Sequence, residues 1–541
     1  MTMWAGLIWR NSAVTCRLWI QGQTVHRMDP MALDTTEVQD LARALLAQLQ
    51  ALQTQIDKDS ADRMKGWAPR IHRPEFAASA TNMAERLALR RSDLSGLQAP
   101  LSALGLSTPG RLDGHVDVSI RAVLASVSRI ACDSPRDFPP RAAFEVGDAV
   151  LQARRDTLFG DQENDAPRTR VMDTLPTEAG TDGGALIGQL AEAGMDCVRI
   201  NCAHDDPQIW GAIVDAIRAL QIASGGRFPV SIDLGGPKFR VTAIEAGKKA
   251  GGTRRVFQPG DQFALVQDLK HAPKDLFSAT LSHAALVAAL SPGAEVSIDD
   301  GKIWARVRSV KDGCAVLEVT RAPEKGGKIK EEKGVNLPGS NLRVGALTPD
   351  DLAALDFVVG HADVVSFSFV RTVEDVNALI GAMRERAAPG AALPAIVLKI
   401  ETPLGLRNLP DLIAAAGGVV PVGVMIARGD LAVEIGFERL SEIQEEILWL
   451  CEAAQVPVIW ATQVPEGMVR DGQATRAEVT DAAMSQRAEC VMLNKGLHVA
   501  EAVSFLRGVL TRMDRHQTKK APRLGPLHLW RGPYLEPVAF N

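Results

Sequence analysis

The sequence predicts an α/β protein built on a (β/α)8 TIM barrel, with a small all-β domain inserted into it and an all-α extension before it. From residue 170 onwards, short apolar segments alternate with segments of helical periodicity, and near-continuous apolar strands are typical of a parallel barrel. Between residues 241 and 333 the alternation gives way to β-rich sequence with Asp-Gly hairpin signals.

The chain before the barrel divides into a lead and a helical extension. Residues 1–34 are expected to be a disordered or weakly structured lead, because arginines interrupt any signal-peptide core there. Residues 35–165 predict helices, since 35–56 carries Leu, Ala and Val at three-to-four spacing and later stretches repeat this pattern. The polar, turn-rich stretch 160–170 is expected to link the extension to the next unit.

The barrel is assigned to residues 166–240 and 334–513, and its eight strands are predicted from apolar runs bounded by polar residues. These runs are 170–175, 196–201, 228–233, 363–369, 395–401, 423–430, 456–463 and 489–496. The β-rich residues 241–333 form the inserted lid domain, placed after the third strand. Residues 514–541 are a Pro-rich tail, too short for a further domain.

Composition limits the classes of partner and compartment. The net charge of −5 over 541 residues gives no sign of a nucleic-acid partner, and no run of about 18 apolar residues predicts a membrane span. The seven cysteines are scattered without a CxxC pair, as is typical of reduced thiols. We therefore expect a cytoplasmic protein.

Charged and polar residues gather where the predicted strands end, which in such barrels is the edge that carries the active site. Lys399 and Glu401 are two apart, so they project to the same side of one strand. A structural salt bridge would account for that pair alone. Asp430 at the end of the next strand favours a Mg²⁺ (or Mn²⁺) site instead, because Mg²⁺ is usually held by one or two carboxylates. The remaining strand-end residues are Arg199, Asn201, Asp233 and Thr462.

Cations near the same edge favour phosphate chemistry, which requires neutralisation of charge on the moving group. Arg199, Lys399, Arg240 and Lys333 are the candidates. The sequence has no P-loop and no kinase glycine-rich loop, so a nucleotide would have to be held in another way.

The sixth strand is expected to end in a tight turn at Arg428-Gly429-Asp430 that aims the carboxylate. Gly429 would let the backbone approach a substrate. Arg428 is expected either to brace neighbouring acids or to touch the substrate.

Eight ordered motifs between residues 170 and 512 resemble those of the pyruvate kinase family. They are EAGMDCVRINCAHD, SIDLGGPKFRV, KGVNLPG, SFSFVRTVEDV, LKIET, ARGDLAVEI, WATQ and TRAEVTDAA. The resemblance implies Mg²⁺-dependent transfer of the phosphoryl group of phosphoenolpyruvate to ADP, giving pyruvate and ATP.

Matching these motifs implies roles for individual residues. Glu401 and Asp430 would bind Mg²⁺, and Lys399 would neutralise the phosphoryl group while Thr462 helps to relay a proton to the enolate carbon. The residues implied to contact phosphoenolpyruvate or pyruvate are Arg199, Lys399, Gly429, Asp430 and Thr462. Those implied to contact ADP or ATP are Asn201, His204, Arg227, Arg240 and Lys333.

The chain also departs from the family pattern. Ala203 and Leu234 stand where the family usually carries two hydroxyl ligands for a monovalent cation, and Lys238 stands where K⁺-dependent members carry Glu. Together with Val241, these residues resemble the K⁺-independent branch, so we expect that K⁺ is not required. The last strand is followed by LNKGLH instead of LSGETA. The usual C-terminal domain is not recognised in this sequence, so the usual allosteric control is not expected.

Two other functions remain open at this point. One is a different Mg²⁺-dependent phosphoenolpyruvate or pyruvate barrel enzyme, of the aldolase or lyase type. The other is a catalytically decayed regulatory or binding protein, which the altered last loop favours and the intact Lys-Glu-Asp-Thr set opposes. The helical extension could cover the barrel, bind a partner or mediate homo-oligomer formation.

Overall fold

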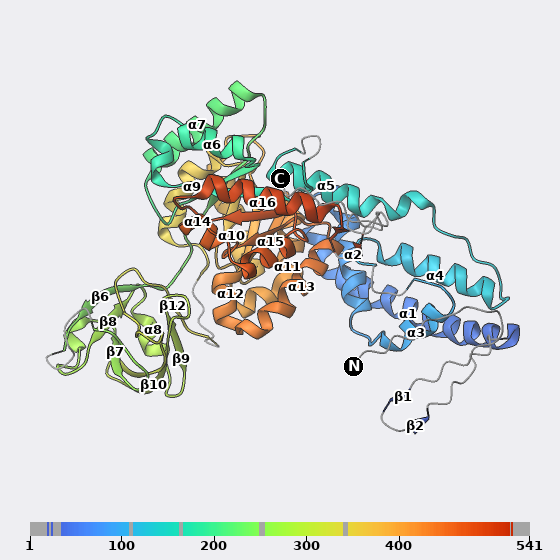
Figure 1. The fold of residues 1–541 in the computed structure, drawn as a ribbon, viewed down its shortest axis with the longest axis horizontal. Helices are drawn as coiled ribbons and strands as arrows, with labels where there is room; N and C mark the ends of the chain where they lie inside the picture. The colour runs from blue at the N-terminus through green and yellow to red at the C-terminus, as the bar shows by residue number, and fades with distance from the viewer. Residues whose placement is uncertain are drawn as a thin grey trace, which may run out of the picture.

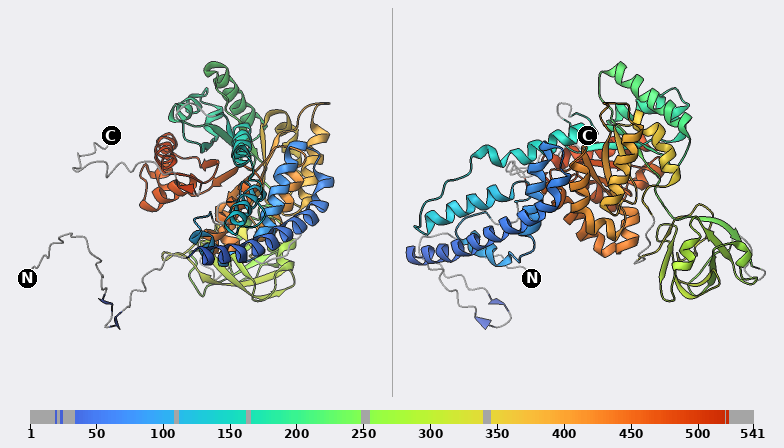
Figure 2. Two further views of the ribbon diagram at one scale, coloured as in Figure 1. Left: turned by 90° about the vertical axis from the view of Figure 1, so that its right-hand side faces the viewer. Right: turned by 180° about the vertical axis from the view of Figure 1, so that it is seen from behind.

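The computed structural model describes residues 19–20, 23–24, 34–107, 112–161, 166–247, 255–338, 345–519 and 521–522. A barrel occupies the centre of the molecule, with a β-sheet domain on one side of it and a helical bundle on the other (Figure 1; Figure 2, right). The predicted fold class is confirmed, because the eight strands expected for the barrel close into one parallel ring.

The ring runs in the order β3, β4, β5, β13, β14, β15, β16 and β17, and β17 pairs with β3 to close it. The strands are β3 (Arg170–Thr174), β4 (Cys197–Asn201), β5 (Val230–Asp233), β13 (Val364–Phe367), β14 (Ala395–Ile400), β15 (Val422–Ala427), β16 (Val458–Ala461) and β17 (Cys490–Leu493). Nearly all their residues are buried, as a barrel wall covered by helices requires.

Helices surround this ring, and several begin with a side-chain cap. Thr348, Thr372 and Thr475 form capping boxes that satisfy free N–H groups in the first turns of α9, α10 and α15. The barrel helices are α6 (Ala185–Ala193), α7 (Pro207–Ser224), α9 (Pro349–His361), α10 (Val373–Arg386), α11 (Pro403–Gly417), α12 (Arg428–Ile435), α13 (Phe437–Ala453), α14 (Glu466–Asp471), α15 (Arg476–Ser485) and α16 (Val499–Asp514).

The end of the sixth strand differs from the prediction. The strand was expected to continue to residue 430 and to end in a tight turn, but β15 ends at Ala427 and α12 begins at Arg428 without an intervening loop. Asp430 therefore lies in the first turn of a helix, where the positive end of the helix dipole favours a carboxylate.

The β-sheet domain leaves the barrel after β5 and returns before α9. Its seven strands are arranged in the order β12-β9-β10-β11-β7-β8-β6 around their own apolar core, in which Phe257 packs edge to face on Phe263 and Phe277. The elements are β6 (Val241–Glu245), β7 (Gln262–Val266), β8 (Ser278–Leu281), α8 (Ala285–Ala289), β9 (Glu295–Ile298), β10 (Ile303–Lys311), β11 (Cys314–Arg321) and β12 (Val335–Asn336). Asp312 and Gly313 both have positive φ in the β10–β11 hairpin, as Asp-Gly turns require.

The extension before the barrel is helical, and its first helix is about 50 Å long at 1.5 Å per residue. The helices are α1 (Thr35–Trp67), α2 (Pro74–Leu89), α3 (Ser95–Ala103), α4 (Val116–Ile130) and α5 (Val146–Phe159). Leucines of α1, α2, α3 and α4 form a core separate from that of the barrel.

The extension also packs against the barrel. The Trp67 indole donates to Asp411 of α11 at 2.7 Å, and the ring of Phe76 lies directly over Gly417. At the end of α5, Leu158 and Phe159 pack with the inner residues at the amino ends of the strands and close that end of the barrel.

The two ends of the chain are described only in part. Apart from the paired strands β1 (Trp19–Ile20) and β2 (Gln23–Thr24), the predicted lead lies outside the described residues before Asp34. After α16, β18 (Gln517–Thr518) pairs with β19 (Ala521–Pro522), and the partly buried Lys519 ammonium lies 2.5 Å from Glu489. Among the described helices, none is long and apolar enough to cross a membrane.

Candidate active site

The polar strand-end residues predicted from the sequence meet at the carboxyl end of the barrel. Along β14, every second side chain points to the same face. Ala395 and Val397 lie in the apolar cluster inside the barrel, so Lys399 and Glu401, two and four residues after Val397, also point inward. Their buried nitrogen and oxygen atoms are 3.4 Å apart, as the spacing of two residues predicted.

Asp233 at the end of β5 holds the two innermost cations together. One of its oxygens lies 2.8 Å from Arg199 and 3.1 Å from Lys399. Burial alone would raise the pKa of Asp233, but the two cations outweigh burial and the pKa is lowered. Burial alone would lower the pKa of Lys399, but Glu401 and Asp233 outweigh it and the pKa is raised. Asp233 is therefore an anion and Lys399 a cation at neutral pH.

Hydroxyl groups complete the environment of these two cations. Ser368 accepts a hydrogen bond from Lys399 at 2.8 Å, and Thr174 accepts one from Arg199 at 3.1 Å. Thr174 and Ser368 were not among the predicted site residues, although each is the last residue but one of a predicted strand, which was the available signal. That Asp233 would bind both cations was also not predicted.

The two candidate metal ligands follow adjacent strands, Glu401 directly after β14 and Asp430 in the first turn of α12 after β15. Glu401 accepts a hydrogen bond from the Phe369 backbone N–H at 2.5 Å. Burial raises the pKa of Glu401, Lys399 opposes this effect, and the negative charge of Asp430 adds to it. A cation between the buried carboxylate of Glu401 and the negative charge of Asp430 would offset this repulsion.

In this structure the ammonium of Lys238 meets Asp430. Its Nζ lies 3.0 and 3.2 Å from the two Asp430 oxygens and 3.5 Å from Asp300 of the β-sheet domain. Burial alone would lower the pKa of Lys238, but Asp430 and Asp300 outweigh burial and raise it. Lys238 thus places a fixed positive charge between the barrel and the inserted domain.

Thr462 follows β16 in a left-handed backbone conformation, with φ of +66°. This conformation is strained for a β-branched residue. Its Oγ1 accepts a hydrogen bond from the Gly429 N–H at 2.9 Å, which joins the ends of β15 and β16.

Arg428 braces this corner of the site. Its guanidinium makes two bonds of 2.6 Å to Asp481, donates to the carbonyls of Ala461 and Thr462, and stacks over Trp460 with 4.7 Å to the ring centroid. Of the two roles considered for Arg428, the structure thus shows the bracing one.

The predicted nucleotide contacts lie further out on the rim. Asn201 accepts from the Ala203 N–H, and Arg240 donates to the carbonyl of Glu332. Lys333 pairs with Asp299 of the β-sheet domain at 2.9 Å. Asn201 lies at the end of β4, and Arg240 and Lys333 lie in the two segments that join the barrel to that domain.

His204 lies on the same rim. Burial lowers its pKa, and the positive charges of Lys495, Arg240 and Arg199 add to this effect against Asp205. The imidazole is therefore neutral at pH 7.

Arg227 is not brought to this edge of the barrel. It precedes β5 and so lies at the amino end of the strands, where its guanidinium donates to the carbonyls of Asp156 and Thr157 at 3.0 and 2.9 Å. These carbonyls belong to the last turn of α5, where a cation is favoured by the helix dipole. The structure gives Arg227 a helix-capping role at the opposite end of the barrel from the other predicted residues.

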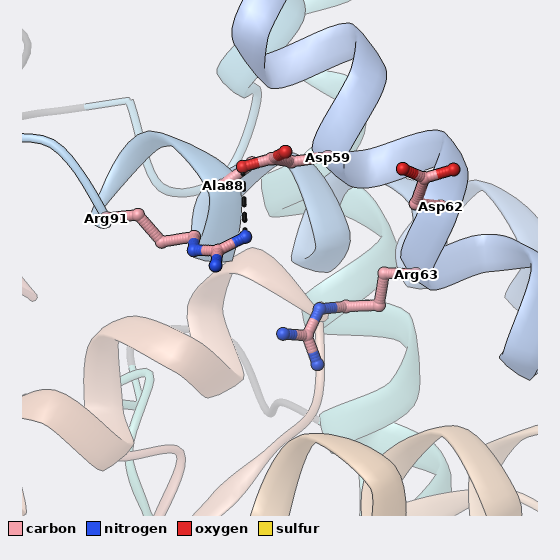
Figure 3. Close-up of a pocket in the computed structure, with 5 residues that line it drawn as sticks. All are labelled: Asp59, Asp62, Arg63, Ala88 and Arg91. Carbon is pink, nitrogen blue, oxygen red and sulfur yellow. Dashed lines mark hydrogen bonds and ion pairs between the residues drawn. The ribbon is translucent and has the colours of Figure 1, made fainter.

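A cavity of about 260 Å³ lies outside this site, in the helical extension. Figure 3 shows the residues that line it, with Arg91 bonded to Asp59 at 3.0 Å. The other lining residues are Asp62, Arg63 and Ala88. All five belong to α1, α2 or the turn after α2, so this cavity is separate from the strand-end residues.

Comparison with known proteins agrees with this arrangement. Residues 166–501 match the family described as pyruvate kinase, barrel domain. A pyruvate kinase of Methylorubrum extorquens is 32% identical over 355 residues, which cover 64% of this chain and 69% of that protein. A pyruvate kinase of Agrobacterium vitis is 32% identical over 346 residues, covering 62% of this chain and 67% of that protein.

A third relative, a pyruvate kinase of Hypocrea jecorina, is 30% identical over 345 residues, and these span only 61% of its length. The matched part contains the whole barrel ring and the inserted sheet, from β3 to β17. The extent of these matches, on a barrel with charged residues at its strand ends, shows that the chain belongs to the pyruvate kinase family.

Proposed function

We propose that the protein transfers the phosphoryl group of phosphoenolpyruvate to ADP, with Mg²⁺ and without a need for K⁺, to give pyruvate and ATP. The observation that supports this most strongly is the pair of buried cations, Arg199 and Lys399, held on Asp233 beside the two carboxylates Glu401 and Asp430. Phosphoryl transfer depends mainly on positioning and on neutralising charge, and this group of residues can supply both.

Lys399 and Arg199 are suited to the moving phosphoryl group. Both are buried, and Asp233 holds them in place. During transfer the bond from phosphorus to the enol oxygen breaks, and a bond to a terminal oxygen of ADP forms. Fixed positive charges stabilise the charge that spreads over the phosphoryl oxygens in between.

Thr462 and Gly429 are suited to the three-carbon part of the substrate. The Thr462 hydroxyl accepts from Gly429, so its own hydrogen remains available for donation. It would help to deliver a proton to the methylene carbon of the enolate. Gly429 has no side chain, so a substrate carboxylate can approach the backbone at the start of α12.

Glu401 and Asp430 would hold the divalent ion. Their oxygens, with substrate oxygens and water, fit the preference of Mg²⁺ for few carboxylates and an incomplete protein shell. When bound, the ion would neutralise charge on the phosphoryl oxygens. Because Lys238 contacts both oxygens of Asp430 in this structure, its side chain would have to give up at least one of these contacts.

Lys238 also motivates the proposed independence of K⁺. A partly buried ammonium already stands beside Asp430, while Ala203 and Leu234 offer no side-chain oxygen to a monovalent ion. We expect that adding K⁺ to an assay free of Na⁺ and K⁺ changes the rate less than about twofold. A rise of many-fold would contradict the proposal.

The rim residues Asn201, His204, Arg240 and Lys333 remain the proposed nucleotide contacts. Asn201 and His204 lie at or after the end of β4, and the basic residues Arg240 and Lys333 lie at the start and the end of the β-sheet domain. Arg227 is left out of this group because of its position at the other end of the barrel.

The direct test is pyruvate formation from phosphoenolpyruvate, ADP and Mg²⁺ by the wild type and by Lys399→Met. Met keeps the length of the side chain and removes its charge, so we expect a loss of kcat of at least about a hundredfold. Lys311→Met is the matched control, because Lys311 is 86% exposed in the β-sheet domain. Its activity should equal that of the wild type.

Three outcomes would count against the proposal. A wild type that binds phosphoenolpyruvate but forms no pyruvate would favour a regulatory protein. Consumption of phosphoenolpyruvate only with an added carbonyl acceptor would favour an aldolase-type enzyme. An active enzyme in which Lys399→Met changes nothing would rule out the role given to this lysine.

A further inference from the structure

The loop after β17, residues 494–498, lies on the rim of the barrel near Arg199. In the ring, β17 pairs with β3, and β3 pairs with β4, which carries Arg199. Thr174 at the end of β3 donates to the carbonyl of Leu493 at 2.9 Å and accepts from Arg199 at 3.1 Å. A chain of two hydrogen bonds therefore links the start of this loop to one of the innermost cations.

The backbone on both sides of Lys495 is fixed. Asn494 donates to Glu466 at 3.1 Å. Gly496 lies so close to Val469 that an added Cβ would stand 2.4 Å from its Cγ1, and the His498 N–H donates to the Val469 carbonyl at 2.9 Å. The loop is thus held on α14 at three points.

Lys495 itself is exposed. Within the part of the chain that the structure describes, it makes no hydrogen bond or ion pair. Unpaired surface lysines are common, so this alone indicates nothing. Lys495 differs from most surface lysines because the residues before and after it are held in place. Its backbone therefore has a fixed position on the rim.

The charges that surround this place are mainly positive. His204 lies in the loop after β4, and besides burial its pKa is lowered by the positive charges of Lys495, Arg240 and Arg199. Asp205 opposes them, but it also accepts a hydrogen bond from Thr177 at 2.7 Å. The sequence LNKGLH carries Lys495 and no acid, so this loop adds a cation to the rim.

We propose that Lys495 binds the phosphate chain of the nucleoside diphosphate, together with Arg240. Arg199 and Lys399 are buried on Asp233 and would serve the inner phosphoryl group, whereas Lys495 is exposed in the loop after β17 and is free to meet an acceptor from solvent. A diphosphate offers several anionic oxygens to a point charge such as an ammonium. This inference rests on the proposed function, in which a nucleoside diphosphate is the acceptor.

The kinetic test compares the wild type with Lys495→Met, Lys495→Arg and the loop control Leu497→Ala. Leu497 is 85% exposed in the same loop and has no charge. We expect the KM for ADP to rise about tenfold in Lys495→Met, because a charge-assisted hydrogen bond is lost. The KM for phosphoenolpyruvate and the kcat at saturating ADP should change less than about threefold. Lys495→Arg should restore most of the ADP affinity, and Leu497→Ala should match the wild type.

A binding measurement separates this inference from the proposed reaction. Calorimetric titration with ADP, and separately with adenosine, should show weaker ADP binding by Lys495→Met and no difference for adenosine. If the wild type binds ADP but forms no pyruvate, the reaction is wrong while this result still supports Lys495 as a phosphate contact. Equal ADP affinity in the wild type and Lys495→Met would overturn the inference, as would a wild type that binds no ADP. A rise in the KM for phosphoenolpyruvate alone would also overturn it.

Discussion

Arg428 offers a sharp test of how the strained corner of the site is held. Its guanidinium contacts four acceptors: both oxygens of Asp481 and the carbonyls of Ala461 and Thr462. Lysine in its place keeps the charge but cannot make the two-pronged contact with a carboxylate. Arg428→Lys would therefore retain part of the ion pair and lose the support of at least one carbonyl.

The expected size follows from the backbone that Arg428 supports. A non-glycine residue in the left-handed region costs about 1–3 kcal/mol, which surrounding contacts must offset. If Thr462 relaxes, its hydroxyl leaves the place where it can reach the substrate. A loss of about 1.4–2.8 kcal/mol in the transition state lowers the rate about tenfold to a hundredfold. We expect this loss in kcat, with the KM for phosphoenolpyruvate changed less than about threefold.

The assay is steady-state pyruvate formation together with thermal unfolding of the same samples. Arg439→Lys serves as the control, because Arg439 is 66% exposed and pairs with an exposed glutamate, so both readouts should equal those of the wild type. If Arg428→Lys keeps kcat within twofold of the wild type, the bracing of Thr462 is not needed for catalysis. If KM rises while kcat is unchanged, Arg428 acts on substrate binding instead.

Three further predictions concern stability. Burial raises the pKa of the Asp173 carboxyl well above its unfolded value of 3.8, so the folded protein loses stability as the pH rises and this group ionises. In urea unfolding, the free energy of unfolding of Asp173→Asn should exceed that of the wild type by more at pH 8 than at pH 5. An equal difference at the two pH values would contradict this. Burial raises the pKa of Glu85 from 4.5 to about 7, so Glu85→Gln should gain roughly 2–3 kcal/mol of unfolding free energy at pH 8 and little at pH 4. A gain that does not depend on pH would contradict the raised pKa. Phe76→Ala should lower the free energy of unfolding by about 3–5 kcal/mol, because the ring is 1% exposed and packs on Gly417. The control Phe138→Ala, at a site 52% exposed, should change this free energy little. Equal losses in the two variants would show that docking of the extension is not stabilising.

The barrel could be predicted because its signal is local and repeated. Each strand is a short apolar run, and the side-chain period of two placed Lys399 and Glu401 on one face without any knowledge of their neighbours. Strand ends were less certain. β15 gives way to a helix at Arg428 because the residues after Ala427 can form a helical turn with Asp430 at its start, and a short sequence window does not distinguish such a turn from a tight loop.

Contacts across the barrel could not be read from the sequence, because they depend on which strands become neighbours. In the sequence Asp233 is one of several polar residues at strand ends, whereas in the fold it joins a cation from β4 to one from β14. Ser368 is one serine within a predicted strand, yet in the fold it accepts from Lys399 and donates to the Leu234 carbonyl. Partners this far apart in the chain are fixed only when the ring closes.

Arg227 and Arg240 show why position along a strand matters more than nearness to a motif. Both are arginines close to the third barrel strand, one before it and one after it. In a parallel barrel these two places lie at opposite ends. Arg240 follows the strand and lies at the start of the β-sheet domain, while Arg227 precedes it and caps α5. An alignment that shifts a residue across a strand therefore moves it across the whole barrel, and strand polarity is the stronger criterion for assigning such residues.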